Sequence, residues 1–142
     1  MRRLLIVATL GGVAALAACS SGGDGSGSGT LDLTGTWTLQ SGSTSAGEIA
    51  VTPDAPVTMD VADDGTVSGT SACNQYTTAV EVDGTDVSFG PAGVTMMACP
   101  DAVMAVETAY LGALADVSSG ERDGDSLVLT GGGAELVFAP TS

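Results

Sequence analysis

Three cysteines are the side chains in this sequence best suited to covalent or metal chemistry. They are Cys19, Cys73 and Cys99, and the 142-residue chain contains no histidine and no lysine. A nucleophilic serine or cysteine needs a basic partner, and catalytic zinc usually has histidine ligands. The composition therefore excludes Ser-His, Cys-His, Ser-Lys and His-ligated zinc designs, and we predict no catalytic, cofactor-binding or metal-ligating residue.

Carboxylates are the remaining groups that could support acid–base catalysis. Many of them stand next to glycine, in Asp63-Asp64-Gly65, Asp83-Gly84 and Asp123-Gly124-Asp125. Asp-Gly between alternating apolar runs is a strong hairpin signal, so these acids are better explained as turn residues. A hydrolase that uses carboxylates or Ser and Thr hydroxyls stays open as an alternative, and it would need several acids in one pocket.

The N-terminal segment is typical of an export signal. Arg2 and Arg3 precede an uncharged run that is too short for a spanning helix and that ends in Leu16-Ala17-Ala18-Cys19. Small residues before a cysteine resemble the bacterial lipobox, whose cysteine receives a diacylglycerol. We expect residues 1–18 to be a signal peptide with a lipobox and Cys19 to be acylated. The alternative is an ordinary signal peptide that happens to contain a cysteine.

This reading places the protein outside the cytoplasm, bound to membrane lipid through the acylated Cys19. It would be exported and anchored to the outer face of the cell membrane, or held in the periplasm or outer membrane of a diderm. Residues 19–30 are rich in glycine and serine and form a flexible tether, and residues 31–140 form one domain. We expect the protein to be a monomer.

The charge of the mature chain restricts its partners. Beyond Cys19 one basic side chain, Arg122, stands against seventeen acidic ones, which gives a formal side-chain charge of −16. Such a surface repels phosphate backbones, so no nucleic-acid partner is expected. A cationic protein or a small ligand fits better.

The two cysteines outside the export signal form an even pair in an oxidising compartment, which predicts a Cys73–Cys99 disulfide. Two buried free thiols are the alternative. Residues beside the two cysteines would be brought together by the bridge, and we take them as a candidate binding surface: Asn74, Tyr76, Thr95 and Met97. The alternative is that Asn74 adopts a turn conformation and Tyr76 packs in the core.

Alternating apolar and polar residues predict short antiparallel strands between the turns. They cover residues 37–40, 57–61, 66–69, 80–82, 87–89, 127–129 and 136–138. From Asp101 to Ser119 the apolar residues recur every three or four positions, which predicts a helix with Pro100 at its start and Gly120 closing it. The fold class is therefore α+β, a mostly antiparallel sheet with one helix packed on it. We assign Trp37 to the core, with the other four aromatic residues as further candidates.

Several motifs in order give the chain a family resemblance. They are Gly35-Thr36-Trp37-Thr38-Leu39, Gly65-Thr66-Val67-Ser68-Gly69, Cys73-Asn74-Gln75-Tyr76, Val87-Ser88-Phe89-Gly90-Pro91, Thr95-Met96-Met97-Ala98-Cys99-Pro100, Glu107 with Tyr110, Leu111 and Leu114, and Leu127-Val128-Leu129. Their order resembles the META domain family, the HslJ-like bacterial lipoproteins and secreted proteins. The resemblance implies a small antiparallel sheet curved into a partial barrel with one helix. It implies no established biochemical activity, although members are associated with heat shock, novobiocin resistance, secretion and motility.

Two positions depart from the family pattern. Ala72 stands where the family usually has glycine, which suggests a different backbone geometry before Cys73. Met96 and Met97 stand where a basic residue is often found, which puts in doubt any role that needs a positive charge beside Cys99.

Together these features predict a membrane-anchored META-domain envelope lipoprotein that is not an enzyme and that has a binding or stress-related role. Besides the hydrolase, an acidic inhibitor of a cationic enzyme such as a lysozyme stays open as an alternative.

Overall fold

The structure is a computed structural model that describes residues 30–142. The predicted signal peptide, the lipobox with Cys19 and all but the last residue of the tether lie outside the described residues. The strands and the single helix follow in the order β1 (Gly35–Thr44), β2 (Gly47–Glu48), β3 (Thr58–Val61), β4 (Thr66–Thr70), β5 (Gln75–Asp83), β6 (Asp86–Phe89), β7 (Gly93–Val94), α1 (Asp101–Asp116), β8 (Ser119–Asp123), β9 (Ser126–Gly131) and β10 (Ala134–Pro140).

The strands form one antiparallel sheet that closes into a ring. Its order is β10-β9-β8-β6-β5-β4-β3-β1, and β1 also pairs with β10, so eight strands make the ring. The two short strands lie outside this path, where β2 pairs with β1 and β7 pairs with β5. The predicted curved sheet with one helix is confirmed, although the ring is not a regular barrel. The shortest strand pairing in the ring is between β6 and β8, and we call it the seam. Asp86 opposite Ser119 is its only pair of facing residues.

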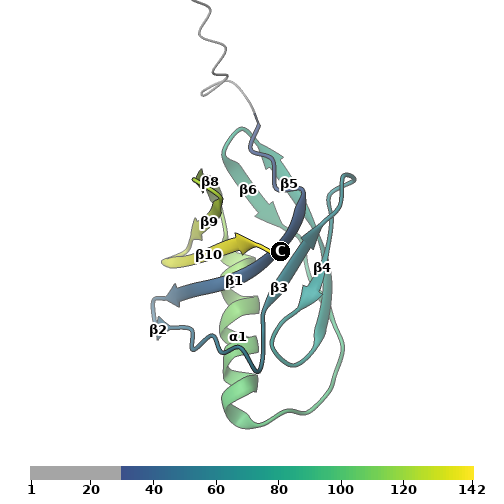
Figure 1. Cartoon of the computed structure of the whole chain (residues 1–142), viewed down its shortest axis with the longest axis vertical. Helices are drawn as coiled ribbons and strands as arrows, with labels where there is room; N and C mark the ends of the chain where they lie inside the picture. The colour runs from purple at the N-terminus through teal and green to yellow at the C-terminus, as the bar shows by residue number, and fades with distance from the viewer. Residues whose placement is uncertain (1–29) are drawn as a thin grey trace, which may run out of the picture.

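The helix α1 lies against β1, β6, β9 and β10, and passes behind β1 and β10 in Figure 1. It begins directly after Pro100, and Asp101 in its first turn favours the positive end of the helix dipole. The predicted start is therefore confirmed, but the predicted end at Ser119 is wrong. The helix stops at Asp116 because the following residues pair with β9 as strand β8, and Gly120 lies in that strand instead of closing the helix.

The core fills the space between the ring and α1. Trp37 is 3% exposed as predicted, its indole nitrogen donates to the Leu33 carbonyl at 2.9 Å, and the Arg122 guanidinium lies 4.7 Å above its ring. Tyr76, Tyr110 and Phe138 are also fully buried, whereas Phe89 is only half-buried. Four of the five aromatic side chains therefore belong to the core.

The acidic turns form where the sequence predicts them. Gly65, Gly84 and Gly124 all have positive φ, between +60° and +85°, which glycine tolerates without a Cβ clash. The Asp64 carboxylate accepts a hydrogen bond from the Thr66 backbone N–H at 2.9 Å, and this bond holds the pKa of Asp64 below its usual value. The Asp64 carboxylate therefore stabilises its turn, as the sequence predicts.

Within residues 30–142 no helix is long and apolar enough to cross a membrane.

Candidate functional site

The Cys73–Cys99 disulfide joins the turn before β5 to the segment that leads into α1. The two Cα atoms are 6.0 Å apart, and the bridge closes a loop with a sequence separation of 26. The predicted disulfide is confirmed, and the alternative of two free thiols is excluded. A cross-link over a loop of this length stabilises the folded chain by about 3.5 kcal/mol in the chain-entropy treatment.

The turn before β5 carries an unusual backbone conformation. Ala72 has φ +80°, the one positive φ among non-glycine residues in the part of the chain that is described. This is the left-handed region, which glycine adopts most easily. Ala72 therefore holds, directly before Cys73, a left-handed conformation that an alanine rarely adopts, and a difference in backbone geometry from glycine at this position stays a prediction. Ser71 closes the turn, with both its N–H and its hydroxyl donating to the Asn74 carbonyl.

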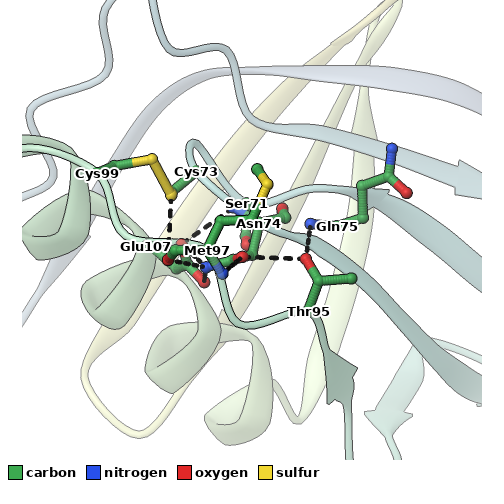
Figure 2. The surroundings of a disulfide bond; sticks show 8 residues. All are labelled: Ser71, Cys73, Asn74, Gln75, Thr95, Met97, Cys99 and Glu107. Atoms are coloured by element: carbon green, nitrogen blue, oxygen red, sulfur yellow. Dashed lines mark hydrogen bonds between the residues drawn. A yellow bond between two sulfur atoms is a disulfide. The ribbon is translucent and has the colours of Figure 1, made fainter.

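Asn74 is the centre of the site (Figure 2). Its side chain is 2% exposed, and its Oδ1 accepts hydrogen bonds from the Met97 N–H at 2.6 Å and from the Thr95 hydroxyl at 3.0 Å. Its Nδ2 also donates to the Met97 carbonyl at 3.2 Å. The amide therefore fastens both backbone polar groups of Met97 to the turn, just ahead of the disulfide at Cys99.

Glu107 of α1 completes this network from the other side. Its carboxylate is 4% exposed and accepts hydrogen bonds from Asn74 Nδ2, at 3.0 and 3.1 Å, and from the Asn74 backbone N–H at 3.2 Å. One asparagine thus joins the turn before β5, the segment before α1 and the helix itself. The bond between Glu107 and Asn74 was not predicted from the sequence. The signal that could have indicated the burial of Glu107 is its position on the apolar stripe of the helix, three residues after Met104 and three before Tyr110.

The Sγ atom of Cys73 lies 3.6 Å from the Met97 carbonyl oxygen. A disulfide sulfur has no proton to donate, so this approach is a packing contact that holds Met97 against the bridge.

Tyr76 belongs to the core instead of the surface. It is 1% exposed, and its hydroxyl lies 2.8 Å from the Thr58 carbonyl and 2.7 Å from the Tyr110 hydroxyl. The Tyr76 proton goes to the Thr58 carbonyl, so Tyr110 donates to Tyr76. Burial raises the pKa of Tyr76 to about 12 and that of Tyr110 well above its usual value.

The four residues of the candidate binding surface therefore divide into two pairs. Asn74 and Tyr76 are buried, so the prediction that they are part of an exposed surface is wrong, and both alternatives hold: Asn74 ends a turn and Tyr76 packs. Thr95 and Met97 are exposed. The bridge does bring Asn74, Thr95 and Met97 together, as expected from their places beside the two cysteines.

A shallow cavity opens beside this network, and we call it the methionine groove. Its volume is about 300 Å³, and Asn74 and Glu107 form part of its wall. Met96 and Met97 line the groove. They are 96% and 58% exposed and are the only exposed large apolar side chains in residues 30–142. The lining residues are Asn74, Val94, Thr95, Met96, Met97, Ala98, Met104, Glu107 and Leu111.

A second cavity, of about 490 Å³, lies at the seam between β6 and β8. Three exposed acids from the β5–β6 hairpin line it, Glu81, Asp83 and Asp86, together with Val82, Val87, Ser88, Val117 and Ser118. Its acids and valines suit a positively charged side chain with an apolar stem.

The buried polar groups of the described chain are satisfied internally. Every buried side-chain nitrogen and oxygen in residues 30–142 has a hydrogen-bond partner. The same residues contain no cluster of three or more His, Cys, Asp or Glu side chains close enough to hold a metal ion. The Asn74–Glu107 network is therefore a closed structural unit, and the open surfaces beside it are the places for a ligand.

Comparison with known families identifies the domain. Residues 30–142 match the family described as "META domain". The chain belongs to the META domain family. The family predicted from the order of motifs between Gly35 and Leu129 is therefore confirmed. The matched residues include the disulfide, Asn74, Glu107 and both cavities.

Solved structures show the same fold. A protein from Burkholderia xenovorans, determined by NMR, is 27% identical over 76% of this chain and 82% of its own, with a TM-score of 0.64. A DUF4847 family protein from Bacteroides vulgatus, determined by crystallography, is 18% identical over 75% of this chain and 92% of its own, with a TM-score of 0.55. No curated protein matches the sequence.

Proposed function

We propose that this META-domain protein is a lipid-anchored protein of the cell envelope that acts by binding a partner in the methionine groove, without catalysing a reaction. The observation that carries the proposal is the exposure of Met96 and Met97 beside an apolar cavity whose walls are held rigidly. Concave sites with mostly apolar walls and a few fixed polar groups are typical of ligand binding.

The exposed methionines are held in place by their backbone. Both backbone polar groups of Met97 are bonded to Asn74, and the disulfide holds Cys99 two residues later. Methionine itself is unbranched and polarisable, so its side chain adapts to different partners. A fixed backbone with adaptable side chains suits recognition better than it suits bond-making chemistry.

The anchor part of the proposal rests on the N-terminal sequence. A basic start, an apolar run and Leu16-Ala17-Ala18-Cys19 occur in the order and spacing of a lipoprotein signal. Two or more acyl chains anchor a protein stably, whereas a single chain does not. The tether that follows would let the domain reach partners near the membrane surface.

The acidic cavity supports a second candidate, an inhibitor of a cationic enzyme such as a lysozyme. Glu81, Asp83 and Asp86 offer negative charge next to apolar walls, and a basic side chain of a partner could enter there. Its binding would weaken with salt, because exposed charges are screened. Binding in the methionine groove would depend far less on salt.

Capture of partners from detergent-solubilised envelope extract on the immobilised full-length protein tests both candidates. We expect a specific partner or ligand to be retained by the wild type and by the Glu81→Gln/Asp86→Asn variant, and to be lost with Met96→Ser/Met97→Ser. Both groove positions are exposed, so the serine variant should fold, and its disulfide and unfolding midpoint provide the check. Loss only with the acid variant would favour the acidic cavity, and equal retention by all three proteins would contradict both candidates.

A further inference from the structure

We propose that the methionine groove binds a soft monovalent metal ion, Cu(I), through the thioether sulfurs of Met96, Met97 and Met104. The inference rests on the proposed binding role of the groove and names its ligand. Residues 30–142 contain four methionines, and three of them line this one cavity. The fourth, Met59, is 0% exposed in the core.

The chemistry of the thioether selects the ion. Thioether and thiolate sulfurs are soft ligands that favour Cu(I), whereas carboxylates and water favour hard cations. A thioether carries no proton to lose, so a set of three needs no histidine and does not compete with protons. The two cysteines of the domain are tied up in the disulfide, which leaves methionine as its available sulfur ligand.

The fold places the three residues on two fixed elements. Met96 and Met97 lie on the segment fastened by Asn74, and Met104 lies on α1, one turn before Glu107. The backbones of Met97 and Met104 are therefore held beside the cavity, with Met96 as the chain neighbour of Met97, and the rotatable bonds of each side chain would allow the three sulfurs to converge on one ion.

The electrostatic surroundings favour a cation. The buried Glu107 carboxylate lines the same cavity, and its hydrogen-bond donors come from Asn74, which is neutral. Arg122, the single basic residue of the described chain, is engaged over the Trp37 ring.

Methionine methyl NMR of the full-length protein in detergent micelles tests the proposal, with the Cys19→Ser substitution removing the remaining thiol. Ag(I) is added as a redox-stable probe, and Cu(I) is added under anaerobic conditions with ascorbate. We expect the methyl signals of Met96, Met97 and Met104 to shift and to saturate at one equivalent of either ion. Met59 is the internal control and should not shift.

The triple variant Met96→Leu/Met97→Leu/Met104→Leu keeps the apolar surface but removes the sulfurs. It should lose affinity by more than the roughly 10–100-fold that even outer-shell substitutions cost a metal site. Unchanged methyl signals in the wild type, or an affinity of the triple variant within threefold of wild type, would overturn the metal site.

The leucine variant also separates this inference from the proposed function. If no ion binds and the leucine variant still captures the partner that Met96→Ser/Met97→Ser loses, the groove is an apolar docking surface and the metal inference is wrong. If neither ion nor partner is retained by the wild type, both proposals are wrong.

Discussion

Asn74 shows how much a single residue can connect in this domain. Its amide oxygen accepts from Thr95 and Met97, its amide nitrogen donates to Met97 and Glu107, and its own backbone N–H also reaches Glu107. The three segments that it joins have few other hydrogen bonds to one another in residues 30–142. We therefore attribute the position of the methionine groove mainly to this side chain.

The substitution Asn74→Ala should lower the free energy of unfolding by about 3 kcal/mol. It removes the acceptor of the Met97 N–H and leaves the Glu107 carboxylate with only the backbone N–H of residue 74 as a donor. Each buried group that loses its partner costs about 1–3 kcal/mol. Denaturant unfolding with the disulfide intact measures the loss. Gln75→Ala is the matched control, since the neighbouring side chain is exposed and should change stability by about 0.5 kcal/mol or less. A loss of under about 1 kcal/mol for Asn74→Ala would contradict the view that this side chain holds the three segments together.

The Tyr76–Tyr110 pair predicts a loss of stability at alkaline pH. An unfolded tyrosine ionises near pH 10, whereas burial raises the pKa of Tyr76 to about 12 and that of Tyr110 well above its usual value. Between pH 10 and about 12 the folded state holds protons that the unfolded state has released. The free energy of unfolding should be unaffected by this pair below pH 10 and fall above it, with a limiting slope of about 1.4 kcal/mol per pH unit for each tyrosine.

Denaturant unfolding at several pH values within that window measures the slope. Tyr76→Phe should lower the stability at neutral pH, because it leaves the Tyr110 hydroxyl without its acceptor, and should make the alkaline slope shallower. A slope unchanged by this substitution would show that other groups cause the alkaline loss.

At the scale of the elements, the sequence predicted best where local patterns agree with the final pairing. The seven alternating runs predicted from the sequence lie in β1, β3, β4, β5, β6, β9 and β10, because each of those strands pairs with a neighbour across a short turn or has a clear apolar face. The two-residue strands β2 and β7 carry too short a pattern to be recognised.

The end of α1 shows where local patterns fail. The apolar stripe continues to Val117, so periodicity alone extends the helix, and Gly120 then resembles a terminating residue. The actual end is set by long-range pairing of Ser119–Asp123 with β9, which a local pattern does not encode. Position 120 is crowded for a different reason, since an added Cβ would lie 2.9 Å from methyl groups of Leu31 and Leu129 and these side chains would have to shift.

The junction of α1 with the β9–β10 turn gives a prediction at this scale. A Cβ at Gly131 would collide with the Asp116 carbonyl at the end of the helix and lie 2.5 Å from the Ser118 nitrogen. Gly131→Ala should therefore cost about 3 kcal/mol of stability, near the upper end for overpacking.

Gly124→Ala is the control for the backbone conformation alone. Gly124 has φ +60° with no atom within 4 Å of an added Cβ, so its substitution should cost only about 1–2 kcal/mol. Thermal or denaturant unfolding compares the two. Equal losses would mean that the helix end moves aside without cost and that the junction does not fix α1.

At the scale of the whole molecule, the ring and the site were predictable to different degrees. The fold class, the disulfide and the family followed from patterns along the chain. The burial of Asn74 and Tyr76 did not follow from such patterns. Both residues are polar or amphipathic, and they are buried through partners more than thirty residues away, Glu107 and Tyr110. The methionine groove depends on that same long-range pairing.

The charge of the mature chain also acts at this scale. With residues 1–18 removed, as we propose, the formal side-chain charge would be −16 and would repel anionic lipid headgroups, so the domain would be held away from the membrane surface at the end of its tether. In the function that we propose, the lipid anchor would determine the location of the protein and the methionine groove would bind the partner.

The most direct test of this account is the chemical state of Cys19 in the native host. The full-length protein is expressed with an alkyne-labelled fatty acid, the membrane and soluble fractions are separated, and the N-terminus is determined by mass spectrometry. We expect a membrane-bound protein that begins at an acylated Cys19 and carries the label, while the Cys19→Ala variant carries none. A soluble, unlabelled wild-type protein cleaved elsewhere would contradict the lipid-anchored function that we propose.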